Sequence, residues 1–145
     1  MTDLEKAKRI LKEKNQSLVI VKNGRTIFSS DSSGIYSLLQ AIERLGEQLS
    51  EASAADKVVG KAAALLLAYS GVAEVYAATL SRKGLKTLSR HGIPVEYALL
   101  VPEILDKEGK DRCPFEKLTS GIESPDHAYE VIKAYLEAVK NEESS

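Results

Sequence analysis

The feature that most constrains the fold is residues 56–69, where eight consecutive apolar residues follow a short charged segment. The apolar part reads Ala-Ala-Ala-Leu-Leu-Leu-Ala-Tyr and predicts a helix that is buried on most sides. A helix of that kind needs other elements around it, so it belongs inside a layered fold. The charged part contains Asp56, Lys57, Gly60 and Lys61, and it places polar groups at the N-terminus of this helix.

Length and composition narrow the class of protein. The chain has 145 residues, which suits one compact domain over residues 1–145. Its 20 lysines and arginines nearly balance 21 aspartates and glutamates, which argues against a surface for long nucleic acid. The single cysteine, Cys113, excludes an intrachain disulfide and predicts a reducing, cytoplasmic setting. No apolar run is long enough to cross a membrane, so we expect no membrane partner; homo-oligomerisation stays open.

The first third of the chain predicts a helix followed by a β-hairpin. Apolar residues recur at helical spacing over 3–14, which indicates an amphipathic helix. Residues 17–22 and 25–30 have strand composition, and only Asn23 and Gly24 separate them. A two-residue Asn-Gly link between such runs is the strongest short signal for a hairpin, because both turn residues need positive φ.

The remainder predicts a sheet with helices on both of its faces. Residues 72–80 and 95–101 are two nearly continuous apolar runs, which is typical of strands that are covered on both faces. Strands separated by helices pair in parallel through right-handed crossovers, which gives a mixed sheet and a three-layer α/β/α sandwich. The helix at 56–69 should connect the second and third strands and lie against the middle of this sheet. The predicted helices are 35–46, 56–69, 81–91, 114–121 and 125 onward, and the predicted strands are 72–80 and 95–101.

The start of the 56–69 helix is a candidate anion site. Lys57 and Lys61 are four residues apart, so in a helix they share one face. Like charge at the positive end of a helix costs ~0.3–1 kcal/mol per residue, and a bound anion would remove that cost. Gly60 has no side chain, so a ligand could approach the backbone closely. In the alternative interpretation Asp56 is only the N-cap, the lysines reach solvent and Gly60 allows close packing.

Cys113 is a second candidate. Pro114 at a first helical position makes Cys113 the N-cap, and Glu116 then occupies the third position, as in a capping box. Cysteine is a poor cap, so capping alone does not explain it. The helix N-terminus and the neighbouring Lys110 and Arg112 favour the thiolate form. The alternative is a small buried residue that fills a gap.

The element order resembles the cytidine-deaminase-like fold. The Asp-Lys-x-x-Gly-x-Ala-Ala run at 56–63 and the Cys-Pro-Phe-Glu run at 113–116 resemble an uncharacterised family, a domain of unknown function, with that fold. In true deaminases the helix after the hairpin starts with His-Ala-Glu or Cys-Ala-Glu, and the next helix starts with Pro-Cys-x-x-Cys. On the predicted order these places fall at 56–58 and 80–84, which hold neither zinc ligands nor the glutamate. The resemblance therefore implies this fold without a metal, without another cofactor and without zinc-dependent deamination.

Three functions follow from these observations. In the first, the protein binds a small anionic, nucleotide-like ligand at the start of the 56–69 helix. In the second, it is an enzyme in which Cys113 is a thiolate nucleophile and Asp56 or a lysine transfers protons. In the third, it is a structural or interaction protein without a ligand. The expected ligand contacts are Lys57, Gly60, Lys61, Ser81 and Arg82.

Overall fold

The computed structural model describes residues 1–32 and 34–144. Within that part of the chain, one five-stranded sheet has the order β2-β1-β3-β4-β5. The strands are β1 (Leu18–Lys22), β2 (Arg25–Ser30), β3 (Ser53–Val59), β4 (Glu74–Ser81) and β5 (Val95–Val101). The helices are α1 (Asp3–Glu13), α2 (Ile35–Leu45), the 3₁₀ helix η1 (Gly46–Leu49), α3 (Lys61–Ser70), α4 (Arg82–Arg90), α5 (Pro114–Leu118) and α6 (Pro125–Ser144).

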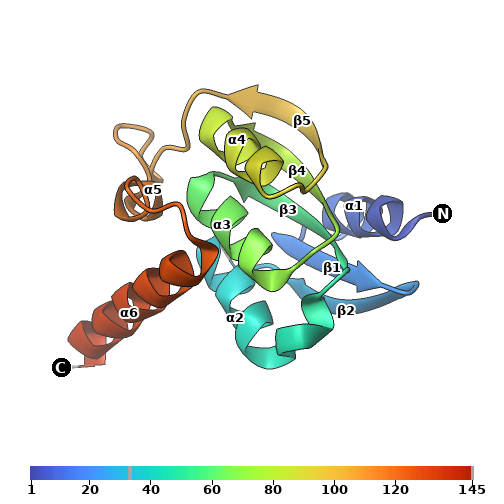
Figure 1. Cartoon of the computed structure of the whole chain (residues 1–145), viewed down its shortest axis with the longest axis horizontal. Coiled ribbons are helices and arrows are strands. Elements are labelled where there is room, and N and C mark those ends of the chain that lie inside the picture. Colours follow the sequence, from blue (N-terminus) through green and yellow to red (C-terminus); the bar gives the residue numbers. More distant parts are fainter. Residues whose placement is uncertain (33, 145) are drawn as a thin grey trace.

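The sheet lies between two layers of helices (Figure 1). Helix α1 packs against β1, β3 and β4 on one face. Helices α2, α3 and α4 lie on the other face, and α6 packs against α3 from outside. Each face therefore has its own apolar core: a small one around Tyr76 under α1, and a large one around α3. The predicted three-layer α/β/α sandwich with a mixed sheet is confirmed.

Strand directions agree with the predicted connections. Strand β1 pairs antiparallel with β2 and with β3, whereas β3, β4 and β5 are parallel. Asn23 and Gly24 have φ values of 52° and 77°, as the two-residue hairpin requires. Each parallel pair is linked by a helix on the same face of the sheet, α3 and then α4.

One prediction about the elements was wrong. Residues 53–59 form β3, the central strand, so Asp56 and Lys57 are not helical and the sheet has one strand more than expected. Alanine, aspartate and lysine are weak strand formers, so local preference gave no signal for this strand. Residues 53–59 nevertheless form a strand because of their central position in the sheet. Ala54 packs in the core on one face of the sheet and Ala55 in the core on the other; both are fully buried, and their small side chains fit there.

Helix α3 is as buried as its composition predicts. Its residues from Lys61 to Leu67 are all buried, and α2, α4 and α6 surround it. It starts after the N-cap Gly60 and ends at Gly71, which has a left-handed φ of 76°. It connects β3 to β4, rather than the hairpin to the next strand, and its N-terminus therefore lies at the carboxyl ends of the parallel strands (Figure 1).

Candidate functional site

A cavity of about 590 Å³ lies at the carboxyl ends of the parallel strands. Open α/β sheets bind ligands at this edge, and the volume is in the range of small-molecule sites. Three parts of the chain form the walls: the N-terminus of α2, the junction of β3 with α3, and the segment between β5 and the end of α5. The lining residues include Gly34, Ile35, Tyr36, Val58, Gly60, Ala62, Ala63, Ile104, Lys107, Cys113, Phe115 and Glu116.

The walls combine a mostly apolar surface with a few polar groups. Ile35, Val58, Ile104 and Phe115 contribute apolar side chains, and Tyr36 adds an aromatic ring that is 47% exposed. An apolar cavity with few polar groups is typical of sites that bind a flat organic molecule. Tyr36 was not predicted as a site residue, because the helix that carries it has the pattern of an ordinary amphipathic helix.

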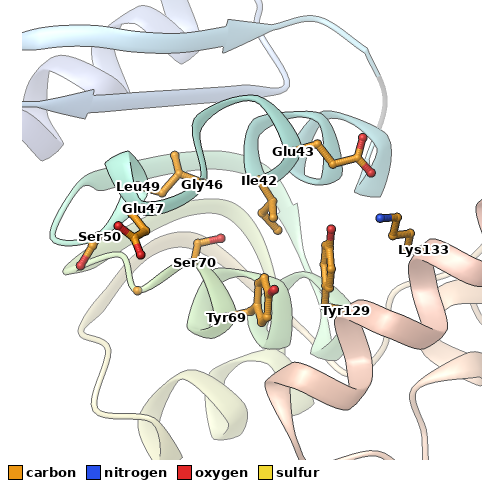
Figure 2. A pocket seen from close by; sticks show the side chains of 11 residues that line it. Ile42, Glu43, Gly46, Glu47, Leu49, Ser50, Tyr69, Ser70, Tyr129 and Lys133 are labelled. Carbon is orange, nitrogen blue, oxygen red and sulfur yellow. The ribbon is translucent and has the colours of Figure 1, made fainter.

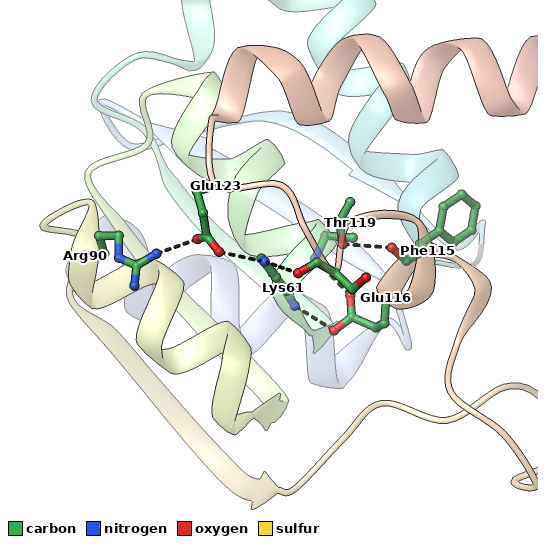
Figure 3. A network of polar contacts seen from close by, with 8 residues as sticks. Lys61, Arg90, Phe115, Glu116, Thr119 and Glu123 are labelled. Carbon is green, nitrogen blue, oxygen red and sulfur yellow. Dashed lines mark hydrogen bonds and ion pairs between the residues drawn. The ribbon is translucent and has the colours of Figure 1, made fainter.

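The protein's own carboxylate occupies the N-terminus of α3. Glu116 accepts hydrogen bonds from the backbone N–H of Lys61 at 2.7 Å and of Ala62 at 2.9 Å (Figure 3). A Cβ on Gly60 would lie within 2.6 Å of Glu116 Cδ and 2.9 Å of Ile104 Cγ1, so the glycine leaves room for this cap. The two motifs singled out in the sequence therefore meet at one point. The anion at this helix start is Glu116, which satisfies the free N–H groups and the helix dipole.

The predicted capping box between Glu116 and Cys113 was wrong. Glu116 bonds to α3 rather than to its own helix, and the Cys113 N–H donates to the Ile104 carbonyl at 3.0 Å. Cys113 is nevertheless the N-cap residue of α5, as predicted, and its side chain makes no capping hydrogen bond. It is half-buried and lines the cavity together with Gly60 and Glu116.

Lys61 is part of a structural network. Its side chain is only 8% exposed, and Nζ donates to the Ser120 carbonyl and to Glu123 Oε1, both at 3.1 Å (Figure 3). Arg90 of α4 pairs with the same Glu123 carboxylate. Hydrogen bonding to Lys61 is the main reason that the pKa of Glu123 is lowered. Lys61 thus fastens the segment between α5 and α6 to the start of α3.

Lys57 and Asp56 lie in β3, so the prediction that Lys57 and Lys61 share a helix face was wrong. Lys57 is exposed, and its Nζ donates to Asn15 Oδ1 at 3.2 Å, away from the cavity walls. Asp56 is not an N-cap: it is 5% exposed, and its Oδ1 accepts from the Val58 N–H at 3.3 Å. Burial raises the pKa of Asp56 to about 7, although hydrogen bonds from the Val58 and Lys57 backbone oppose this shift.

Ser81 and Arg82 lie where β4 ends and α4 begins. The Ser81 hydroxyl accepts from the Gly84 N–H at 3.0 Å and so caps α4, whereas Arg82 is exposed. Ser81 also lines a small hollow together with Lys83 and Arg112. This hollow shares the residues Ile104 and Glu116 with the cavity, so the two spaces are neighbours. Sequence reasoning did not name Lys83, because its position beside Arg112 depends on the loop after β5.

The comparisons with known proteins identify the family. Residues 6–136 match the family model described as TM1506, domain of unknown function (DUF1893). The chain belongs to the DUF1893 family. A crystal structure of a DUF1893 family protein, TM1506 from Thermotoga maritima, has 32% sequence identity and a TM-score of 0.85 over 92% of this chain and 89% of that chain. Comparison with curated proteins gave no match.

More distant solved structures show the fold alone. RibD from Acinetobacter baumannii has 22% identity and a TM-score of 0.51, and the likeness covers 66% of this chain. This chain spans about a third of the RibD chain, since 34% of RibD is covered. The five-stranded mixed sheet and the helices around it are consistent with a cytidine-deaminase-like fold. No helix among the described residues has the length and apolar character that a membrane crossing requires.

The strand β3 changes which residues of this DUF1893 protein correspond to the deaminase motifs. The helix directly after the hairpin is α2, and the next α-helix is α3. The two motif places are therefore 34–36 and 60–63, rather than 56–58 and 80–84 as expected from the sequence. Residues from both places line the cavity at the carboxyl ends of the parallel strands.

Proposed function

We propose that this DUF1893 protein binds a small nucleotide-like ligand, with a flat apolar body and an anionic group, in the 590 Å³ cavity. The position of the cavity carries the proposal: it lies at the carboxyl ends of the parallel strands, between the N-termini of α2 and α3. Tyr36, Val58 and Phe115 offer apolar and aromatic surface for a flat ring. Gly60 lies in the same wall, where its lack of a side chain leaves room for the Glu116 carboxylate.

Basic side chains beside the cavity support an anionic ligand. Lys83 and Arg112 line the neighbouring hollow, and no hydrogen bond or ion pair of either side chain occurs among the described residues. Glu103 and Glu116 line the same hollow, and the pKa of Asp111 is lowered mainly by its hydrogen bond from Lys117 and also by the charge of Arg112. An anion bound here would nevertheless displace no side-chain hydrogen bond of Lys83 or Arg112. The ammonium groups of Lys57 and Lys61 are bound to other groups, so the geometry favours Lys83 and Arg112 as the anion contacts. Arg82, at the exposed start of α4, is a further proposed contact.

The residues at the two motif places and beside them argue against a zinc site. Residues 34–36 and 60–63 contain no histidine, cysteine or glutamate. Zinc sites are built from several such ligands, and the nearby Glu116 uses both carboxylate oxygens on the start of α3. No group of three or more histidine, cysteine, aspartate or glutamate side chains in the described part is placed to hold a metal. We therefore propose ligand binding without zinc-dependent deamination.

Calorimetric titration with nucleoside monophosphates and the matching nucleosides tests this function. We expect the monophosphates to bind, and the double variant Lys83→Ala/Arg112→Ala to weaken their binding by about tenfold or more, because each contact to a phosphate is charge-assisted. Tyr36→Ala should weaken the binding of nucleotides and nucleosides equally, since it removes apolar surface from the cavity.

The matched control is Lys86→Ala/Arg25→Ala, which changes the net charge equally but alters no residue of the cavity or the hollow. Equal losses in both double variants would contradict the proposal, since they would report net charge only. Absence of binding for every nucleotide would also contradict it, and would favour a structural or interaction protein.

A second function follows from Cys113. Its position in the cavity wall would allow the thiolate to attack an electrophilic carbon of a bound ligand, with the bonding electrons leaving on the displaced group. The pKa of Asp56, raised to about 7 by burial, suits proton transfer at neutral pH. However, Asp56 is not among the residues that line the cavity. The geometry thus favours Cys113 more than Asp56 as a catalytic residue.

The rate of Cys113 alkylation by iodoacetamide checks this second function. We expect Cys113 to be alkylated readily in the free protein, because it is only half-buried and lines the cavity, and alkylation to slow when a nucleotide is bound. Since Cys113 is the single cysteine of the chain, mass spectrometry reports its modification without ambiguity. An alkylation rate that bound nucleotide leaves unchanged would contradict a role for Cys113 in chemistry on the ligand.

A further inference from the structure

A second and larger cavity, of about 980 Å³, lies at the other end of α3. The C-terminal part of α2, the 3₁₀ helix η1, the end of α3 and helix α6 form its walls (Figure 2). It shares no residue with the candidate site at the N-terminus of α3. Any role for it is therefore independent of the function proposed above.

The groups around this cavity favour a cation. Helix α2 ends at Leu45 and α3 ends at Ser70, and the C-terminal end of a helix carries a partial negative charge. The last turn of α2 contains Arg44, whereas the last turn of α3 contains no basic residue to balance that charge. Two exposed carboxylates, Glu43 and Glu47, line the cavity, and neither has a hydrogen bond or an ion pair among the residues that the structure describes.

Two stacked tyrosines form the middle of the cavity. The rings of Tyr69 and Tyr129 are parallel to within 6°, and their centroids are 4.4 Å apart. Aromatic faces attract ammonium groups, and the protein already has one such contact here: Lys133 Nζ lies 5.8 Å from the centroid of the Tyr129 ring. Ile42 and Leu49 are buried apolar residues behind the wall of the same cavity. The middle of the cavity thus suits an alkyl chain that carries positive charge at its ends.

The placement of the carboxylates selects the kind of cation. Glu47 lies beside Ser50 at one end of the cavity, whereas Glu43 lies at the other end, near Lys133 (Figure 2). A molecule with one ammonium group could pair with only one of them. We propose that this cavity binds a linear aliphatic diamine or polyamine, with one ammonium group at Glu43, another at Glu47 and the alkyl chain over the tyrosine rings.

Calorimetric titration of the full chain with cadaverine, spermidine and pentylamine tests the proposal. The buffer should have low ionic strength, about 20 mM, because salt screens exposed charges. We expect cadaverine to bind about tenfold more tightly than pentylamine, which has the same chain and one ammonium group fewer. Glu43→Gln/Glu47→Gln should abolish that preference. Lys133→Gln should strengthen binding of cadaverine about threefold, because it removes a competing positive charge.

The matched control is Glu130→Gln/Glu137→Gln, which removes two negative charges from α6 outside the cavity. An equal loss of affinity in this control would overturn the proposal, because it would show attraction to net charge alone. Equal binding of cadaverine and pentylamine, or no binding of either amine, would also overturn it. Circular dichroism of each variant verifies that the substitutions leave the fold intact.

Discussion

Replacement of Asp56 by asparagine is expected to stabilise the protein at about pH 8 and to have little effect at about pH 4. Burial raises the pKa of Asp56 to about 7 in the folded protein, whereas an unfolded aspartate titrates near ~3.9. Between these values the folded state holds a proton that the unfolded state has lost. Stability therefore falls as pH rises from about 4 to about 7, and stays lower above that range.

The expected size of the effect is large. A difference of about three pH units corresponds to about 4 kcal/mol, and Asp56 is too buried for solvent to screen this cost. Asparagine has the same shape and remains neutral, so the variant should lack this part of the pH dependence. Urea denaturation of both proteins from about pH 4 to pH 8 measures the difference in the free energy of unfolding.

Asp31→Asn is the control for this experiment. Asp31 is exposed, so its substitution should change the free energy of unfolding by less than about 0.5 kcal/mol at any pH. A constant difference between wild type and Asp56→Asn across the pH range would contradict the prediction. It would mean that the Asp56 carboxylate is ionised in the folded protein down to the same pH as in the unfolded chain.

Local patterns predicted most elements of the fold correctly. The hairpin depends on Asn23 and Gly24, whose positive φ values are a property of the turn itself. Helix α1 depends on an apolar stripe and on its capping box at Thr2, and α6 begins at Pro125 as expected. These signals lie within a few residues of the element that they define, so a single sequence is enough to read them.

Strand β3 could not be predicted in this way. Its residues have no alternating apolar pattern, and their propensities favour a helix as much as a strand. The strand exists because β1 and β4 pair with it on both sides, and these partners lie far away in the sequence. Because this strand was not predicted, the expected start of α3 was at Asp56 instead of Lys61, and Asp56 and Lys57 were assigned to the helix instead of to β3.

The residues named for the candidate site make contacts that the sequence analysis did not predict. Glu116 lies 55 residues from Lys61 along the chain, and no local rule connects them. One signal was present, however: Gly60 is an N-cap residue without a side chain, so another part of the chain must supply the cap. The Cys-Pro-Phe-Glu run contains Glu116, which supplies that cap, and only the folded chain shows that Glu116 lies beside Gly60.

Glu116→Ala is expected to destabilise the protein by about 3 kcal/mol, because it leaves two buried N–H groups at the start of α3 without their charged acceptor. Amide hydrogen exchange should accelerate at Lys61 and Ala62, which identifies the lost contact directly. Urea denaturation gives the change in free energy. Glu108→Ala in the same segment is the control. Because Glu108 is exposed, its substitution should lower the free energy of unfolding by less than about 0.5 kcal/mol.

Gly60→Ala should act through the same contact. The added Cβ would lie within 2.6 Å of Glu116 Cδ, so the carboxylate must leave the helix start or distort it. In a protein that already carries Glu116→Ala, the Gly60→Ala change should therefore cost much less, since the two atoms nearest to the added Cβ belong to the Glu116 carboxyl group. A double-mutant cycle measures this coupling, which we expect to be about 1–3 kcal/mol. Additive effects would show that Gly60 and Glu116 act separately, and that the cap does not require the glycine.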